Sequence, residues 1–199
     1  MSQRTSQQQD AEEVFFHPSS LVEGRVGRGT RVWAFAHVME GALVGVGCNL
    51  GECTFVESGA TVGDFVTVKN GVQLWHGVTC DDWVFIGPNA TFTNDVRPRA
   101  AQRKRPALLA TTRVGRGASI GANATVVAGN SIGAYAMVGA GAVVTKDVPC
   151  HALVVGNPAH QVGWVCRCGE DLDDALSCPH CGSAFVPTEA GLTIRNIAE

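Results

Sequence analysis

The chain has 199 residues and a formal net charge of −3, and only 17% of its residues are charged. This length fits one domain with a small appendage, and such a charge gives no general affinity for nucleic acid. No apolar run approaches the roughly 20 residues that a membrane-spanning helix needs. The 24 glycines and single tyrosine favour a fold made of tight turns.

The first segment, residues 1–13, is polar and rich in glutamine. It lacks the basic and then apolar layout of a signal peptide. We therefore expect a disordered lead-in and a cytoplasmic protein. Residues 15–22 form a looser opening turn, which we expect to cap the first coil of a repetitive fold, because a solenoid otherwise exposes an open backbone edge.

An apolar residue recurs at every sixth position from Val26 to Phe92. The residue four places after each of these anchors is small or β-branched. Neither a helix nor an ordinary strand gives a six-residue period, so the pattern predicts an all-β fold, a parallel β-helix of hexapeptides. Three hexads make one triangular coil, so residues 18 apart stack at about the 4.8 Å spacing of neighbouring strands. The anchors are Val26, Val32, Val38, Val44, Leu50, Val56, Val62, Val68, Leu74, Cys80, Ile86 and Phe92.

The six-residue phase breaks after Asn94, and the six-residue repeats resume at Val114. Residues 95–112 between them are basic and contain two prolines, so we expect a loop extruded from one corner of a β-helix domain that spans 14–163. Loops of this length in a compact domain are usually functional or disordered. The basic residues of this loop are Arg97, Arg99, Arg103, Lys104 and Arg105.

The repeat also places polar residues above one another. His76 and Asn94 both hold the third place of their hexads and are 18 residues apart. They should stack in the column Glu40, Ser58, His76 and Asn94, directly beneath the basic loop. A polar column beside a basic loop is a candidate site for a charged ligand.

The hexads, followed by VVTKDVP (143–149) and VGNPA (155–159), resemble the left-handed β-helix acyltransferases over residues 15–165. The segments VWAFAHV (32–38), KNGV (69–72) and GPNATFTND (87–95), with Pro98-Arg99, narrow the resemblance. They look like the N-acetyltransferases that acetylate the 3-amino group of nucleotide-linked amino sugars.

The resemblance implies an enzyme of surface polysaccharide or antibiotic sugar synthesis. Its substrate would be a UDP- or dTDP-linked 3-amino sugar, whose amine attacks the thioester of acetyl-CoA directly. It also implies a homotrimer, with acetyl-CoA lying along the groove between neighbouring β-helices.

Two residues of the column are candidates for the reacting centre. The resemblance implies that Asn94 contacts the sugar there, whereas an asparagine at this point could also cap the turn into the loop. His76 could serve as a general base, because imidazole titrates near neutrality. The family usually has an aromatic and then an acidic residue where this chain has Trp75-His76, so His76 could equally be an exposed histidine without a role.

Four more residues are candidates for substrate binding. Asp95 and Glu57 flank the column and could hold sugar hydroxyls, although solvated carboxylates are common. His37, which we place at a turn, is expected to contact substrate or a subunit interface, or otherwise to be a satisfied structural histidine. Arg99 could bind a phosphate or a sugar carboxylate in a bidentate manner, whereas charge runs are often simply solvated.

Acetyl-CoA needs no glycine-rich phosphate loop in such a fold. Backbone groups at Ala122, Gly139 and Ala140 could bind the pantetheine arm, and Lys146 could meet a phosphate. Small residues at these positions are also what the coil demands sterically.

The eight cysteines fall into two groups. Cys48, Cys53, Cys80 and Cys150 are scattered, and Cys48 and Cys80 take inward positions typical of reduced core thiols. The other four form a CxC and a CxxC pair, each followed by glycine, in a zinc-ribbon-like module over residues 164–187. Four thiolates in two close pairs suit a closed, structural Zn²⁺ site better than a redox pair. The expected ligands are Cys166, Cys168, Cys178 and Cys181, with His180 a less favoured substitute.

The last segment, residues 188–199, is expected to form a short helix or to fray. This kind of fold also hosts other functions. A γ-type carbonic anhydrase needs closely spaced histidines, and His37 and His76 do not stack. The remaining alternatives are an acetyltransferase with a histidine base that acts on another small acceptor, and a non-catalytic scaffold.

Overall fold

A computed structural model describes residues 13–102 and 104–195. Residues 1–12 of the predicted lead-in (1–13), the loop residue Arg103 and residues 196–199 lie outside the described residues. In the described part of the chain, no helix is long and apolar enough to cross a membrane.

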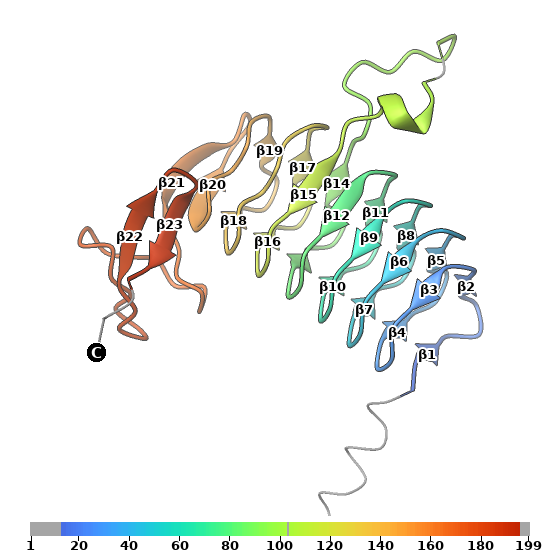
Figure 1. The fold of residues 1–199 in the computed structure, drawn as a ribbon, viewed down its shortest axis with the longest axis horizontal. Helices are drawn as coiled ribbons and strands as arrows, with labels where there is room; N and C mark the ends of the chain where they lie inside the picture. Colours follow the sequence, from blue (N-terminus) through green and yellow to red (C-terminus); the bar gives the residue numbers. More distant parts are fainter. Residues whose placement is uncertain (1–12, 103, 196–199) are drawn as a thin grey trace, which may run out of the picture.

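The chain winds through three sheets, here called A, B and C, in repeating coils (Figure 1). Their strands pair parallel, except that the last two strands of sheet A, Ala152–Val155 and His160–Trp164, pair antiparallel with each other. Sheet A contains β1 (Phe15–Phe16), β4 (Arg31–Val32), β7 (Asn49–Leu50), β10 (Thr67–Val68), β13 (Phe85–Ile86), β16 (Ser119–Ile120), β18 (Met137–Val138), β20 (Ala152–Val155) and β21 (His160–Trp164). Sheet B contains β2 (Leu21–Val22), β5 (His37–Val38), β8 (Phe55–Val56), β11 (Gln73–Leu74), β14 (Thr91–Phe92), β17 (Thr125–Val126) and β19 (Val143–Val144). Sheet C contains β3 (Arg25–Val26), β6 (Leu43–Val44), β9 (Thr61–Val62), β12 (Val78–Cys80) and β15 (Thr112–Val114).

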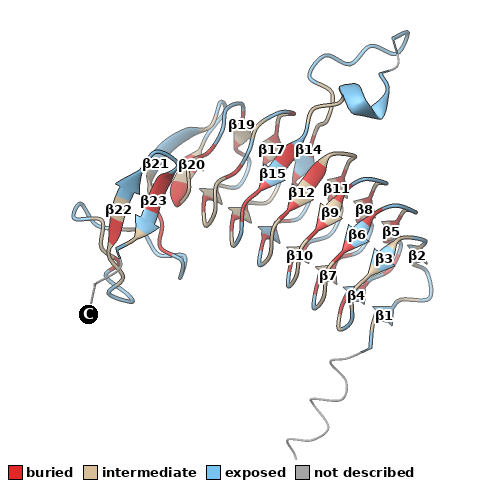
Figure 2. Cartoon of the chain, viewed as in Figure 1, coloured by how far each residue is buried: buried red, intermediate tan, exposed pale blue. Residues whose placement is uncertain are grey.

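The register between coils is the predicted one. Val68 of β10 lies between Leu50 and Ile86 in sheet A, each 18 residues away. The anchors from Val32 to Phe92 are all buried, and they form a single core along the inside of the coils (Figure 2). The predicted parallel β-helix is therefore confirmed. Burial raises the pKa of the Cys80 thiol to about 12, as expected for an inert core cysteine.

The basic loop is an insertion between two coils. Cys80 pairs with Val114, 34 residues away instead of 18, so 16 extra residues leave the coil here. A short 3₁₀ helix, η1 (Pro106–Leu108), lies in this segment, and β15 already begins at Thr112. The loop projects away from the stack of coils (Figure 1). Its base is closed by the Ala110 N–H, which donates to the Asn94 carbonyl at 2.9 Å.

The C-terminal module docks on the last coil through backbone contacts. The Val165 N–H donates to the His151 carbonyl, and the His151 imidazole Nδ1 donates back to the Val165 carbonyl, both at 2.8 Å. His151 is buried between the Tyr135 and Phe185 rings, and this burial lowers the pKa of its imidazole. A Cβ on Gly191 would come within 2.5 Å of the Cys150 carbonyl oxygen, so glycine permits this close approach.

One expectation for this end is wrong. Residues 191–194 form neither a helix nor a frayed end: β23 (Gly191–Ile194) pairs antiparallel with β22 (Phe185–Thr188). Leu192 is buried in a small apolar cluster with Phe185, Cys166 and Cys178. Burial of the Leu192 and Phe185 side chains stabilises the pairing of β22 with β23.

The stacked anchors should carry most of the fold's stability. Leu50 is fully buried, so Leu50→Ala should lower the free energy of unfolding by about 2–5 kcal/mol. Leu108→Ala is the matched control, because that side chain is 69% exposed in the loop. Urea unfolding of both variants measures the difference, and equal losses would contradict the assignment of the core.

Candidate functional site

The polar column predicted from the repeat exists, at the corner where sheet B turns into sheet C. We call this the BC corner, and the corner between sheets A and B the AB corner. Gly59 follows Ser58 of the column and has φ +81, a conformation that favours glycine. A Cβ on Gly59 would lie 2.3 Å from the Nδ1 atom of His76. Glycine here therefore makes room for the imidazole over the coil below.

The His76 imidazole is held in one tautomer by a backbone carbonyl. Its Nδ1 atom lies 2.8 Å from the Ser58 carbonyl oxygen, 18 residues earlier in the same column. A carbonyl can only accept a hydrogen bond, so Nδ1 must carry the proton. In the neutral ring the lone pair is then on Nε2, which makes that atom a proton acceptor.

Residues in the coils below and above His76 form hydrogen bonds to its backbone. The Glu57 Oε2 atom accepts a hydrogen bond from the His76 N–H at 2.7 Å. The Asn94 Nδ2 atom donates to the His76 carbonyl at 3.5 Å, the upper limit for such a bond. The structure thus brings Glu57, His76 and Asn94 together, and it gives the Glu57 carboxylate a partner within the chain.

His37 lies two coils below this group, and its expected place at a turn is wrong. It belongs to the strand β5, where its side chain points outward from sheet B because Val38 takes the inward position. Its Nε2 atom lies 3.1 Å from Glu23 Oε2, and its ring packs edge-on against Phe55 with 5.3 Å between centroids. The strand register, with alternate residues facing out, overrides the turn position read from the hexads.

The two loop candidates have partners within the loop. The Asp95 carboxylate forms an ion pair with Lys104 and accepts a hydrogen bond from the Arg97 N–H at 2.9 Å. The lysine ammonium lowers the pKa of this carboxyl below its usual value. Arg99 is exposed and donates from Nη1 to the neighbouring Pro98 carbonyl at 3.0 Å.

The residues expected to bind acetyl-CoA lie at two different corners. Ala122, Gly139 and Ala140 belong to turns at the AB corner, where the coils approach so closely that a Cβ on Gly121 would lie 2.4 Å from the Ala140 nitrogen. Lys146 follows β19 and lies at the BC corner, above the column of His76 and Asn94. One chain does not bring these two groups together.

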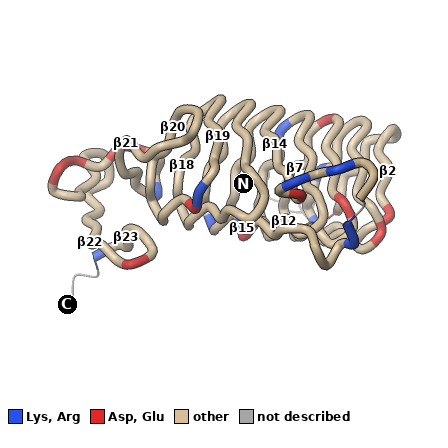
Figure 3. Tube along the Cα trace, turned by 90° about the horizontal axis from the view of Figure 1, so that it is seen from above, with Lys and Arg blue, Asp and Glu red and all other residues tan. Residues whose placement is uncertain are grey.

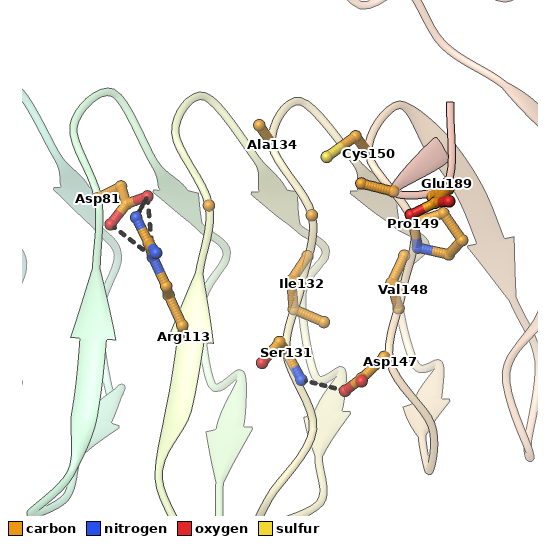
Figure 4. Close-up of a pocket in the computed structure, with 13 residues that line it drawn as sticks. Asp81, Arg113, Ser131, Ile132, Ala134, Asp147, Val148, Pro149, Cys150 and Glu189 are labelled. Carbon is orange, nitrogen blue, oxygen red and sulfur yellow. Dashed lines mark hydrogen bonds and ion pairs between the residues drawn. The ribbon is translucent and has the colours of Figure 1, made fainter. Parts of the chain in front are cut away.

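A separate groove of about 600 Å³ lies on the outer face of sheet C at its C-terminal end. Figure 4 shows its main polar features: the Arg113 guanidinium pairs with Asp81 at 2.9 Å, and the Asp147 carboxylate accepts from the Ser131 N–H. The turn between β22 and β23 contributes Glu189 and Ala190 to its wall. None of the predicted site residues lines this groove, and its one arginine is already paired.

The four clustered cysteines meet in the C-terminal module. Their sulfur atoms all lie within 4.8 Å of one another. The Cys166–Cys181 and Cys168–Cys178 sulfur pairs are 3.4 and 3.5 Å apart, too far for disulfide bonds of about 2.05 Å. Four sulfurs at about 2.3 Å from a tetrahedral Zn²⁺ would be about 3.8 Å apart. The cluster therefore fits a metal, with Cys166 and Cys178 buried and the other two exposed.

Sequence reasoning missed two features of this region. The Ser58 carbonyl, which sets the His76 tautomer, is a backbone group and leaves no trace in residue identity. Gly59, 17 residues before His76, was an available signal for a side chain that folds back over the coil. The partner of Asp95 was also missed, because nothing in the spacing distinguishes Lys104 from the arginines beside it.

The tautomer of His76 can be tested directly. Long-range ¹H–¹⁵N correlation spectra of the histidine-labelled protein should show the neutral His76 ring protonated on Nδ1 with a pyridine-type Nε2. His76→Gln identifies the signal by removing it. A neutral His76 protonated on Nε2 would contradict the hydrogen bond to Ser58.

Comparisons with known proteins show what this geometry is similar to. No protein-family model matches the chain. The chain is 47% identical over 179 residues to the dTDP-3-amino-3,6-dideoxy-alpha-D-galactopyranose 3-N-acetyltransferase of Aneurinibacillus thermoaerophilus, covering 88% of this chain and 92% of the relative.

Solved structures share the coil architecture. The acetyltransferase domain of PglB from Neisseria gonorrhoeae superposes with a TM-score of 0.53 at 25% identity, over 76% of this chain. A point mutant of GDP-perosamine N-acetyl transferase from Caulobacter crescentus, in complex with CoA and GDP-perosamine, superposes with a TM-score of 0.50 at 24% identity, over 77% of this chain. At this identity the second match shows the fold alone. The chain spans 58% of the length of each of these two solved chains.

The match at 47% identity extends over nearly the whole of both sequences. The chain belongs to the hexapeptide-repeat N-acetyltransferases of nucleotide-linked amino sugars, which are acyltransferases that use acetyl-CoA.

Proposed function

We propose that the chain transfers the acetyl group of acetyl-CoA to the 3-amino group of a dTDP-linked 3-amino-3,6-dideoxyhexose. The observation that carries this proposal is the relative with that activity in its name, 47% identical over 92% of its own length. It favours dTDP over UDP and a 6-deoxy sugar over a uronic acid.

The reaction needs an unprotonated amine next to a thioester. The amine nitrogen bonds to the acetyl carbonyl carbon, the carbon–sulfur bond breaks, and CoA leaves as its thiol once a proton reaches the sulfur. The amine must also lose a proton as it becomes an amide. A group that accepts this proton beside the attacking nitrogen lowers the barrier by general-base catalysis.

In the proposed mechanism His76 accepts that proton at Nε2. Its Nδ1 proton is held by the Ser58 carbonyl, so the lone pair on Nε2 is available to the amine. Asn94 contacts the sugar at the reacting centre, and its amide lies one coil above the imidazole. Glu57 acts through the His76 backbone, which it fixes at 2.7 Å. Direct attack without a base is the competing mechanism, and His76 variants distinguish the two.

The phosphates would be met by cations from two places. Arg99 on the loop offers a planar guanidinium that suits a diphosphate, and Lys146 offers a point charge at the BC corner. Ala122, Gly139 and Ala140 offer close-packed backbone to the pantetheine arm at the AB corner. Because these corners are separate in one chain, we propose a homotrimer in which the AB corner of one copy faces the BC corner of the next.

The four-cysteine cluster is proposed to hold one structural zinc ion. All four cysteines would be ligands, so the ion would have no open coordination position for a catalytic water or substrate. The ion would tie Val165 and Phe185, which flank its ligands, to His151 on the last coil. None of the eight cysteines, all within the described residues, forms a disulfide, which fits the reducing cytoplasm that we propose as the site of the reaction.

A substrate panel tests the proposed activity. Purified protein with acetyl-CoA should release CoA thiol with a dTDP-linked 3-amino-3,6-dideoxyhexose, and with a markedly lower kcat/KM for the UDP-linked and 4-amino counterparts. Mass spectrometry of the product should show one added acetyl group. No turnover with any amino sugar by an intact oligomer would overturn the enzyme proposal.

His76→Asn separates the two roles of His76. Asparagine can keep a donor near the Nδ1 position but loses the Nε2 acceptor. If Nε2 accepts the proton, His76→Asn should lower kcat by about 10²-fold or more without a matching rise in KM. A wild-type rate in His76→Asn would establish direct attack without a base.

Zinc removal should destabilise the C-terminal end. Metal analysis should find about one zinc per chain, and a chelator should lower Tm, by about 2–4 °C for each kcal/mol of stability lost. Cys178→Ser should reproduce this effect, because Cys178 is buried in the cluster, whereas Cys53→Ser should not, because Cys53 is exposed and outside it. Much less than one zinc per chain in native protein would refute the site.

A further inference from the structure

The basic loop contains a single acidic residue. Residues 95–112 contain five basic residues, and Asp95 is the one acidic residue in this segment. Segments of one charge sign repel themselves and extend. A loop of this composition therefore needs a specific interaction if its cations are to point to one place.

Asp95 supplies that interaction at the base of the loop. Its carboxylate binds the Lys104 ammonium nine residues on, and it also accepts from the Arg97 N–H at 2.9 Å. The same ammonium donates to the Arg97 carbonyl at 3.3 Å. These contacts hold the returning half of the loop against the outgoing half.

Asp95 pairs with Lys104 and not with the loop arginines that the structure describes. Asp95 is the residue after Asn94, so the pair lies one residue from the polar column. Within the described residues no ion pair involves Arg97, Arg99 or Arg105. Figure 3 marks the basic residues of this loop in blue, and Figure 1 shows that the loop points away from its own coils. Guanidinium groups are the cations that match a diphosphate in planar, bidentate geometry.

We propose that Asp95 and Lys104 are positioning residues: their ion pair folds the loop so that its arginines bind the diphosphate of a substrate. Asp95 then holds no sugar hydroxyl, which departs from the role expected for it from sequence. The inference rests on the proposed function for the identity of the ligand. Both the nucleotide sugar and CoA carry a diphosphate, and the test has an arm for each.

The two accounts of Asp95 predict opposite signs for one substitution. If Asp95 merely lies near the phosphates, Asp95→Asn removes a repulsive charge and should tighten binding of dTDP. If Asp95 positions the arginines, Asp95→Asn should weaken dTDP binding by on the order of tenfold, because a small misplacement of binding groups is costly. Isothermal titration calorimetry with dTDP, and separately with CoA, measures this without turnover.

Lys104→Met and the double variant, Asp95→Asn with Lys104→Met, complete a double-mutant cycle. As partners in one interaction, the two single variants should weaken dTDP binding alike, and the double variant should be no worse than either. The charge exchange of Asp95→Lys with Lys104→Asp should recover part of the affinity. Hydrogen exchange of residues 96–102 and 104–110 should rise in each single variant. Lys69→Met, a lysine outside the loop, is the control for lost positive charge.

The other outcomes either overturn the inference or change the ligand assigned to the loop. Additive losses would make Lys104 a direct phosphate ligand. Unchanged dTDP binding with a fall in kcat in Asp95→Asn would return Asp95 to the sugar. A loss for CoA but not for dTDP would confirm the positioning role and assign the loop to the cofactor. Failure of wild-type protein to bind dTDP would refute the proposed function itself, whatever the loop does.

Discussion

The structure depends on one constraint, the vertical stacking of residues 18 apart. Apart from short bonds within its turns, each coil makes its backbone hydrogen bonds to the coils above and below, so a side chain's place in its hexad fixes its height and corner. The same stacking that buries Leu74 and Phe92 sets His76 above Ser58 and beneath Asn94. Core and site are therefore not independent parts of this molecule.

This constraint explains why the fold was predictable from the sequence. A six-residue period has one structural interpretation, so the sheets, the stacking and the column followed from it. The loop was predictable as well, because a break in phase followed by a return of the six-residue period indicates an insertion between two coils. The antiparallel strand at Gly191–Ile194 was not, because it depends on contacts with Cys150 and Phe185 that no local pattern announces.

The site was only partly predictable. The stacking register predicts which residues lie above one another, but it does not predict where each side chain points. His37, in phase with the repeat, therefore proved to lie on a strand and to face Glu23. Hydrogen bonds to backbone carbonyls, such as that of His76 to Ser58, depend on coil spacing rather than on residue identity. The Asp95–Lys104 pair depends on how an irregular loop folds, and irregular loops have no period from which to read it.

The central claim is that the coil below His76 orients the imidazole so that Nε2 can accept a proton during catalysis. Two matched glycine substitutions test this claim. Gly59 and Gly129 both have left-handed backbones, φ +81 and +87, and both lie at the BC corner. An added Cβ would meet His76 Nδ1 at 2.3 Å at Gly59, but only the Ala110 Cβ at an ordinary 3.7 Å at Gly129. The measurement is kcat for Gly59→Ala relative to Gly129→Ala. We predict a ratio well below one with both variants folded, whereas equal values would contradict the claim.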